Sequence, residues 1–283
     1  MPELPEVEVL VRHLRPLLRS RSIRSVHVNR PKVIRPHTPP EMERALIGSA
    51  FHSIRRRGKY LVFSLRNRQR AVSVKLLGHL GMTGRMYLQP RATPLPRHTA
   101  VALDLGSTTF VFEDTRCFGR FTFDHGLLDH LGPEPLSARF TVTRFAVALK
   151  HSSQPVKIRL LDQTIAAGVG NIYASEALFH ARIDPRLAAG KLSPAQVRSL
   201  FAAIRHVLRR AIRWGSTIPL DWAGTGLRDG LFYFGGTEPR SSGRHERLRV
   251  YDRAGQPCAT CRTPIHRIVQ AHRSTFFCPA CQS

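Results

Sequence analysis

The chain begins Met1-Pro2-Glu3-Leu4-Pro5-Glu6, and the residues after this opening predict a helix. From Pro5 to Leu18, apolar residues recur at spacings of three and four, which is the buried stripe of an amphipathic helix; they are Val7, Leu10, Val11, Leu14 and Leu18. Proline and acidic residues favour a first helical turn, so a helix start is one interpretation of the opening. The other is chemical: without Met1, Pro2 would carry a free amine, a nucleophile close to two carboxylates.

The composition indicates a partner with negative charge. The chain has 283 residues, and 44 Lys and Arg against 19 Asp and Glu give a net charge of +25. Such a basic surface is typical of proteins that bind polyanions. No apolar stretch approaches the ~18 residues of a spanning helix, and the acidic opening lacks the pattern of a signal peptide. We therefore expect a cytoplasmic protein that contacts nucleic acid and does not enter a membrane.

The first half of the chain is rich in short β-type runs. Between about Ser22 and Phe123, apolar and β-branched segments alternate with Gly, Pro and Asn turns; the clearest runs are Ile23 to Val28, Tyr60 to Ser64, Ala100 to Asp104 and Thr109 to Phe112. This pattern predicts a sandwich of two sheets.

The second half changes to helical periodicity after the break Gly132-Pro133-Glu134-Pro135. Pro194 to Trp214 predicts the clearest helix, with Ser193 and Gln196 spaced as a capping box and Gly215 as its stop. The stretch from Trp222 to Arg247 is rich in Gly, Ser and Arg and predicts a long loop, which in a compact domain is usually functional or disordered.

Four of the five cysteines lie near the C-terminus in a metal-binding pattern. Cys258-x-x-Cys261 and Cys278-x-x-Cys281 are separated by sixteen residues, which is the spacing of a four-thiolate zinc site. Four thiolates leave no open position for water, so this Zn²⁺ should be structural. The residues between the two pairs predict a basic hairpin next to a phosphate backbone; they include Arg262, His266, Arg267, His272 and Arg273.

Several motifs, in this order, resemble the formamidopyrimidine-DNA glycosylase family nearly from end to end. They are MPELPEVE at Met1 to Glu8, RGKYL at Arg57 to Leu61, HLGMTG at His79 to Gly84, LGPEPL at Leu131 to Leu136, GVGNIYASE at Gly168 to Glu176, and the four-cysteine finger. The resemblance implies an α+β multidomain fold in three parts. These are an N-terminal β-sandwich with flanking helices (1–134), a helical helix-two-turn-helix domain with a lesion-recognition loop (135–247), and a β-hairpin zinc finger (248–283).

The same resemblance implies a bifunctional DNA glycosylase and AP lyase of base excision repair, acting on 8-oxoguanine and formamidopyrimidines. Pro2 would attack the deoxyribose C1′ and form a Schiff base, Glu3 would be the general acid, and Glu6 a supporting carboxylate. Lys59 matches the lysine credited with proton transfer in β-elimination, although it could equally be a plain phosphate contact. Arg273 matches the finger arginine that grips the phosphate of the lesion and is linked to δ-elimination.

The resemblance also implies DNA contacts. His79, His98, Lys157 and Asn171 match positions that contact DNA, and Met82, Arg116 and Phe118 match the wedge that fills the gap left by an everted base. Without the family, Met82 and Phe118 would be interpreted as core residues. Two features depart from the usual pattern: Cys117 replaces an arginine, and the segment Ser216 to Tyr251 is longer than usual.

Two alternatives stay open. One is an endonuclease VIII-like enzyme for oxidised pyrimidines, with the same chemistry; Leu4-Pro5 and the intact wedge favour the purine enzyme. The other is a catalytically silent zinc-finger protein that binds distorted duplexes. In each case the expected partner is double-stranded DNA with damaged bases or abasic sites, and we expect a monomer in the bacterial cytoplasm or nucleoid with one zinc ion.

Overall fold

A computed structural model describes residues 2–67, 72–215 and 248–283. Two compact units are present, residues 2–129 and residues 130–213 with 248–283, and each is described by itself. Met1 and the predicted loop between Trp222 and Arg247 lie outside the described residues, as does most of the atypical segment 216–251. Within the described residues, none of the helices has the length and apolar character needed to cross a membrane.

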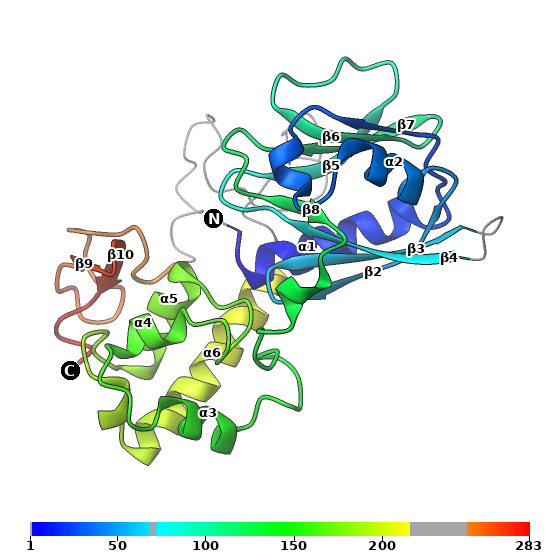
Figure 1. Cartoon of the computed structure of the whole chain (residues 1–283). Helices are drawn as coiled ribbons and strands as arrows, with labels where there is room; N and C mark the ends of the chain where they lie inside the picture. Colours follow the sequence, from blue (N-terminus) through cyan, green and yellow to red (C-terminus); the bar gives the residue numbers. More distant parts are fainter. Residues whose placement is uncertain (1, 68–71, 216–247) are drawn as a thin grey trace. The chain divides into compact units, whose positions relative to one another are not determined.

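The N-terminal unit contains two four-stranded antiparallel sheets (Figure 1). One sheet has the order β1-β6-β7-β5, formed by Ser25–Val28, Thr99–Asp104, Thr108–Glu113 and Arg85–Pro90. The other has the order β2-β3-β4-β8, formed by Ala50–Arg57, Tyr60–Asn67, Val72–His79 and Arg120–Thr122. The predicted β-sandwich is therefore confirmed, and each of the four predicted runs overlaps a strand.

Aromatic side chains join the two sheets. The ring of Phe63 in β3 lies 5.9 Å from that of Phe110 in β7, and Phe110 also stacks on Phe121 of β8 at 6.1 Å. All three side chains are fully buried. Large buried rings contribute strongly to a core through their apolar area, so this cluster fixes one sheet against the other.

Helix α1 spans Leu4–Leu18 and packs against β2 (Figure 1). The stripe predicted from the sequence is buried, and Leu4 and Val9 are buried as well. The buried face of α1 belongs to the same core as the two sheets. The N-terminal end of the chain is thereby attached to a rigid element. A second α-helix, α2, spans Pro39–Leu46, and the short 3-10 helices of the unit are Pro31–Ile34 and His125–Leu128.

The second unit is mainly helical. Its helices are α3 (Val142–Leu149), α4 (Val156–Leu160), α5 (Asn171–Ala181) and α6 (Pro194–Trp214), with a 3-10 turn at Ala189–Lys191. The predicted capping box of α6 is present: the backbone N–H of Ser193 donates to Gln196 Oε1 at 2.9 Å, and the N–H of Gln196 donates to Ser193 Oγ at 3.2 Å. The two turns between α4 and α5 complete the helix-two-turn-helix.

The C-terminal residues form the predicted β-hairpin, β9 (His266–Gln270) paired with β10 (Arg273–Phe277). Ala271 and His272 make the two-residue turn, both with positive φ, as a type I′ hairpin turn requires. Arg273 follows the turn directly and is exposed. The hairpin packs on α5 through a small apolar cluster that includes Phe179, Val250 and Phe276.

Candidate active site and metal centre

The opening residues are held at the N-terminal end of α1 by a reciprocal pair of hydrogen bonds. The backbone N–H of Glu3 donates to Glu6 Oε2 at 2.9 Å, and the carboxylate of Glu3 accepts from the backbone N–H of Glu6. Such a capping box satisfies N–H groups that a helix start leaves unpaired. Pro2, Glu3 and Glu6 are all buried. The helix start is therefore confirmed, and it places Pro2 directly before Glu3 at the buried end of α1, where the chemical interpretation requires it.

Lys59 lies in the two-residue turn that joins β2 to β3. Arg57 pairs with Tyr60 across this turn, and Gly58 has φ +56. A positive φ at the first central position is the geometry of a tight hairpin turn, which glycine adopts without strain. The turn presents Lys59 at the end of the sheet that packs on α1.

His79 ends β4 opposite this turn, paired with Tyr60 of β3. Burial, with the positive charges of Lys59 and Arg120, lowers the pKa of His79 to about 4. The ring is therefore neutral at pH 7. Its Nδ1 accepts a hydrogen bond of 3.1 Å from the backbone N–H of Gly81, which leaves the ring proton on Nε2. A neutral Nε2–H is a hydrogen-bond donor suited to a phosphate oxygen.

The predicted wedge residues are exposed, although two of them are large and apolar. Met82 is 45% exposed and Phe118 is 48% exposed, and Arg116 is exposed as well. The guanidinium of Arg116 lies over the Phe118 ring, 4.7 Å from its centroid. Met82 and Phe118 thus place apolar side chains on the surface, as the predicted wedge requires. Their interpretation as core residues is wrong.

The four cysteines of the finger converge. Their Sγ atoms all lie within 4.8 Å of one another, and three of the pairs are 3.3, 3.4 and 4.0 Å apart. Tetrahedral Zn²⁺ with Zn–S bonds of ~2.3 Å requires sulfurs about 3.8 Å apart. Four thiolates this close together would repel one another unless a cation neutralised them. Burial and the neighbouring thiols accordingly raise the pKa of Cys278 and Cys281. The donor set fits one structural zinc ion.

The finger is attached to the start of α5 by polar contacts. Asn171, the first residue of α5, donates from Nδ2 to the backbone carbonyl of Ser274 at 3.0 Å. Lys157 in α4 is fully buried, and its Nζ donates to Asn171 Oδ1 and, at 3.4 Å, to the same carbonyl. Ser274 follows Arg273 in β10, so these contacts fix the strand that carries Arg273.

Three family models match the chain in sequence order. They are the formamidopyrimidine-DNA glycosylase N-terminal domain over residues 1–121, the H2TH domain of the same enzyme over 131–220, and a zinc finger found in FPG and IleRS over 255–283. The formamidopyrimidine-DNA glycosylase of Thermus thermophilus is 43% identical over an alignment of 289 positions, gaps included, which covers 100% of this chain and 98% of the relative. The chain belongs to the formamidopyrimidine-DNA glycosylase family.

Solved structures of this family have the same fold. The crystal structure of the Thermus thermophilus MutM (Fpg) protein has a TM-score of 0.82 at 40% identity, covering 99% of this chain and 98% of that one. A Lactococcus lactis Fpg mutant in complex with Fapy-dG containing DNA has a TM-score of 0.85 at 29% identity, covering 100% of both chains. The protein is thus a DNA glycosylase of base excision repair, with a zinc finger.

Sequence reasoning missed one residue that connects the segments of the predicted wedge. Asp114 is fully buried. Its carboxylate accepts from Thr83 Oγ1 at 2.7 Å and from the backbone N–H groups of Arg116 and Gly119 at 3.2 and 2.8 Å. One buried side chain therefore connects the turn that carries Met82 with the turn that carries Arg116. The only signal in the sequence was its place three residues before Cys117 in the Asp-x-Arg-x-Phe-Gly pattern.

A second missed residue anchors the finger. The carboxylate of Glu176, in α5, is almost fully buried and accepts from three successive backbone N–H groups, those of Arg249, Val250 and Tyr251, at 2.8 to 2.9 Å. Three N–H donors to one carboxylate compensate for much of the cost of burial. Glu176 lies within a motif quoted above, but its local sequence gives no indication of a partner more than 70 residues away.

The remaining predicted contact, His98, lies in the loop before β6 and is partly buried. Its carbonyl accepts from the backbone N–H of Asp114 at 3.0 Å, so His98 lies next to the segment that leads to Arg116. Cys117 has φ +52, and its side chain packs against the core of the sandwich. Although Cys117 stands where the usual pattern has an arginine, its neighbours Arg116 and Phe118 still lie on the surface.

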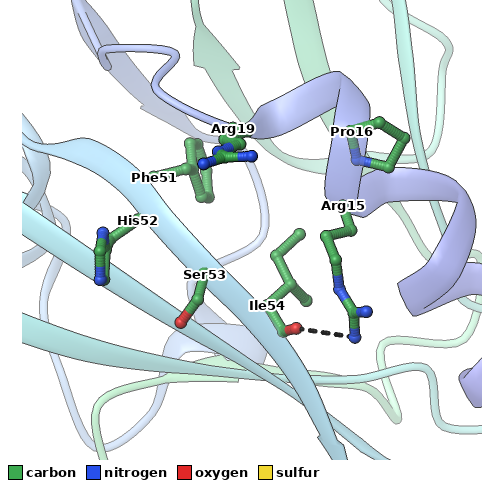
Figure 2. Close-up of a pocket in the computed structure, with 7 residues that line it drawn as sticks. All are labelled: Arg15, Pro16, Arg19, Phe51, His52, Ser53 and Ile54. Carbon is green, nitrogen blue, oxygen red and sulfur yellow. Dashed lines mark hydrogen bonds between the residues drawn. The ribbon is translucent and has the colours of Figure 1, made fainter.

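A pocket of about 340 Å³ in the N-terminal unit lies apart from the predicted site (Figure 2). Figure 2 shows Arg15 of α1, and Arg19 directly after that helix, above the β2 residues Phe51 to Ile54. Arg15 is eleven positions after Leu4, which places it about 16 Å along the helix from the N-terminal end of α1. Its guanidinium donates to the carbonyl of Ile54 at 3.4 Å, and this contact caps the edge strand of the sheet.

Proposed function

We propose that this protein removes oxidised purines, 8-oxoguanine and formamidopyrimidines, from duplex DNA with the nitrogen of Pro2 as nucleophile. The observation that carries the proposal is the capping box, which holds Pro2 and Glu3 at the rigid end of α1. Once Met1 is removed, the Pro2 nitrogen forms a bond to C1′ while the C1′–base bond breaks, and the departing base takes a proton from water. A proton passes from the nitrogen to O4′ by way of Glu3, the C1′–O4′ bond breaks, and an iminium remains.

Strand cleavage follows by β,δ-elimination. In β-elimination a proton leaves C2′ and the C3′–O bond breaks, which releases the first phosphate; we assign this proton transfer to Lys59. In δ-elimination a proton leaves C4′ and the C5′–O bond breaks, and Arg273, exposed beside the hairpin turn, binds that phosphate. Water then hydrolyses the imine and restores Pro2. We assign Glu6 the role of a supporting carboxylate: its Oε2 accepts from the backbone N–H of Glu3 and so holds the residue that carries the general acid.

The DNA contacts are proposed in the same way. His79 donates from Nε2 to a phosphate, and His98 and Asn171 lie on loops or helix ends that suit a backbone contact. Buried Lys157 acts through Asn171. Met82, Arg116 and Phe118 fill the gap left by the everted base. The exposure of Met82 and Phe118 supports this assignment, because apolar surface in water is stabilised when bases stack on it.

We further propose three domains, 1–134, 135–247 and 248–283, in a monomer of the bacterial cytoplasm or nucleoid. The change of unit at residues 129 and 130 and the matches to 1–121, 131–220 and 255–283 support these boundaries. A net charge of +25 disfavours self-association and favours DNA.

Oxidised pyrimidines are a second candidate substrate. A structure of the wild-type Lactococcus lactis Fpg, with a TM-score of 0.86 at 29% identity, is a complex with DNA that contains an oxidised pyrimidine. The purine enzyme stays the first choice because the complete wedge of Met82, Arg116 and Phe118 is exposed for the gap.

A panel of matched duplexes tests the proposal. Base release and strand nicking are measured on 8-oxoguanine, formamidopyrimidine, 5-hydroxycytosine and abasic-site duplexes, with Glu3→Gln as the control. Faster release of the two purine lesions, with nicked products that carry phosphate at both ends, is the expected result. Preference for 5-hydroxycytosine would replace the purine assignment, and binding without base release or nicking would identify the silent DNA-binding protein.

A further inference from the structure

Glu8 lies one helical turn beyond the catalytic end of α1 and binds two arginines at once. Its Oε1 accepts from Arg12 Nε at 2.8 Å, and its Oε2 accepts from Arg56 Nε at 2.9 Å. The two ion pairs differ in environment: the Arg12 side chain is 59% exposed, whereas that of Arg56 is 10% exposed. Exposed pairs contribute little, so the contact between Glu8 and Arg56 is the more significant one.

Arg56 continues this contact into the turn that carries Lys59. Its Nη1 donates to the backbone carbonyl of Gly58 at 3.1 Å, and that carbonyl belongs to the peptide group whose N–H is that of Lys59. The planar guanidinium makes both bonds from fixed positions, Nε toward Glu8 and Nη1 toward Gly58. An unbroken chain of hydrogen bonds therefore leads from α1 through Glu8 and Arg56 to the Gly58–Lys59 peptide.

We propose that Glu8 and Arg56 are positioning residues for the lyase step, which hold the Lys59 turn in register with the end of α1 that carries Pro2 and Glu3. This inference rests on the function proposed above for Lys59. Two groups that act on one sugar must keep a fixed separation, and a misplacement of about 1 Å costs on the order of a hundredfold in rate. A two-residue turn with a positive φ at Gly58 can change the direction of Lys59 by small backbone rotations, and the Arg56–Gly58 contact opposes them.

The charge state of Glu8 suits this role. Burial raises the pKa of Glu8, but hydrogen bonds and charges from Arg12 and Arg56 outweigh it and leave the pKa below its ordinary value. Glu8 is therefore ionised at neutral pH, where its contact with Arg56 is an ion pair.

The experiment separates Schiff-base formation from elimination. Glu8→Gln and Arg56→Met are compared with wild type on a preformed abasic-site duplex, and borohydride trapping and β-elimination are timed separately in single turnover. We expect trapping within about twofold of wild type and elimination slowed on the order of tenfold or more, because Pro2 keeps its own support while Lys59 loses its register. The double variant should be no slower in elimination than Arg56→Met, because Glu8 acts on the Lys59 turn only through Arg56.

Arg12→Met is the matched control. It removes the other ion pair of Glu8 but touches no part of the Lys59 turn, so elimination should stay at the wild-type rate. Thermal unfolding of each variant is measured to check that the fold is retained. A merely structural role would lower trapping and elimination together; that result, or unchanged elimination in both variants, overturns the proposal.

Lys59→Met distinguishes failure of this inference from failure of the proposed function. Slow elimination in Lys59→Met beside normal elimination in Glu8→Gln and Arg56→Met overturns only the positioning role. Normal elimination in Lys59→Met overturns the assignment of Lys59 itself.

Discussion

The backbone N–H of Glu3 donates a hydrogen bond of 2.9 Å to Oε2 of Glu6, and both side chains are buried at the start of α1. One residue pair thus combines a helix cap with the proposed catalytic centre. Each carboxylate accepts from the backbone N–H of the other residue, so the pair acts as one reciprocal cap.

Replacement of Glu6 tests whether its acceptor or its charge matters. Glu6→Gln keeps an oxygen that can accept the Glu3 N–H, whereas Glu6→Ala removes it and should lower the free energy of unfolding by about 1 kcal/mol. Base release should therefore fall much more in Glu6→Ala than in Glu6→Gln. Equal losses in the two variants would show that Glu6 acts by its charge and that the capping role is secondary.

Asp114→Asn should impair base eversion more than chemistry. An amide has one acceptor oxygen, so at least one of the three contacts of Asp114 is lost, at a cost of about 1 to 3 kcal/mol. Base release from an 8-oxoguanine duplex should slow, while nicking at a preformed abasic site, where no base has to be everted, should change little. Thr83→Val, which removes only one of the three donors, should have a smaller effect. Parallel losses on both duplexes would contradict the role in the wedge.

Acid should destabilise the folded protein through two histidines. Burial is the largest cause that lowers the pKa of both His79 and His180 to about 4, below the ordinary value of 6.5. Between these values the unfolded state binds more protons, so stability is fully present above pH 6.5 and falls as the pH drops toward 4. Thermal unfolding from pH 7.5 to 4.5 should show this loss. His180→Gln should weaken the dependence, and an unchanged slope would contradict the assignment to His180.

Zinc removal should release the finger and abolish DNA binding. Chelation leaves four crowded thiols, so that only the apolar cluster and the polar contacts of Glu176 and Asn171 still hold the finger. Metal binding in such small modules contributes directly to folding. Metal analysis should give one zinc per chain, lost in Cys258→Ser, and duplex affinity should fall with it. Retained affinity in a zinc-free protein would contradict the structural role.

The sequence predicted the elements whose signals are local. The stripe of α1 and the box formed by Ser193 and Gln196 depend on residues three or four positions apart, and both are present. The zinc ligands were equally predictable from the sequence, because each cysteine pair lies on one turn and thiolate chemistry limits the choice of metal.

Contacts between distant segments were not predictable in this way. Lys157 bonds to a carbonyl 117 residues away, and Asp114 joins Thr83 across 31 residues. Hydrophobicity alone also placed Met82 in the core, whereas it lies on a turn that Asp114 connects to the neighbouring one. Hydrogen-bond partners that are far apart in the sequence are determined by how whole helices and strands pack. A local sequence pattern does not predict that packing.

In the proposed mechanism the Pro2 nitrogen forms the covalent bond to DNA. The most direct measurement of this bond is borohydride reduction of the protein on an abasic-site duplex, followed by peptide mass mapping of the adduct. The mechanism predicts chains without Met1, one deoxyribose remnant on the Pro2 nitrogen, and no adduct in Pro2→Gly or in chains that keep Met1. An adduct on a lysine, or no adduct from chains that begin at Pro2, would contradict it.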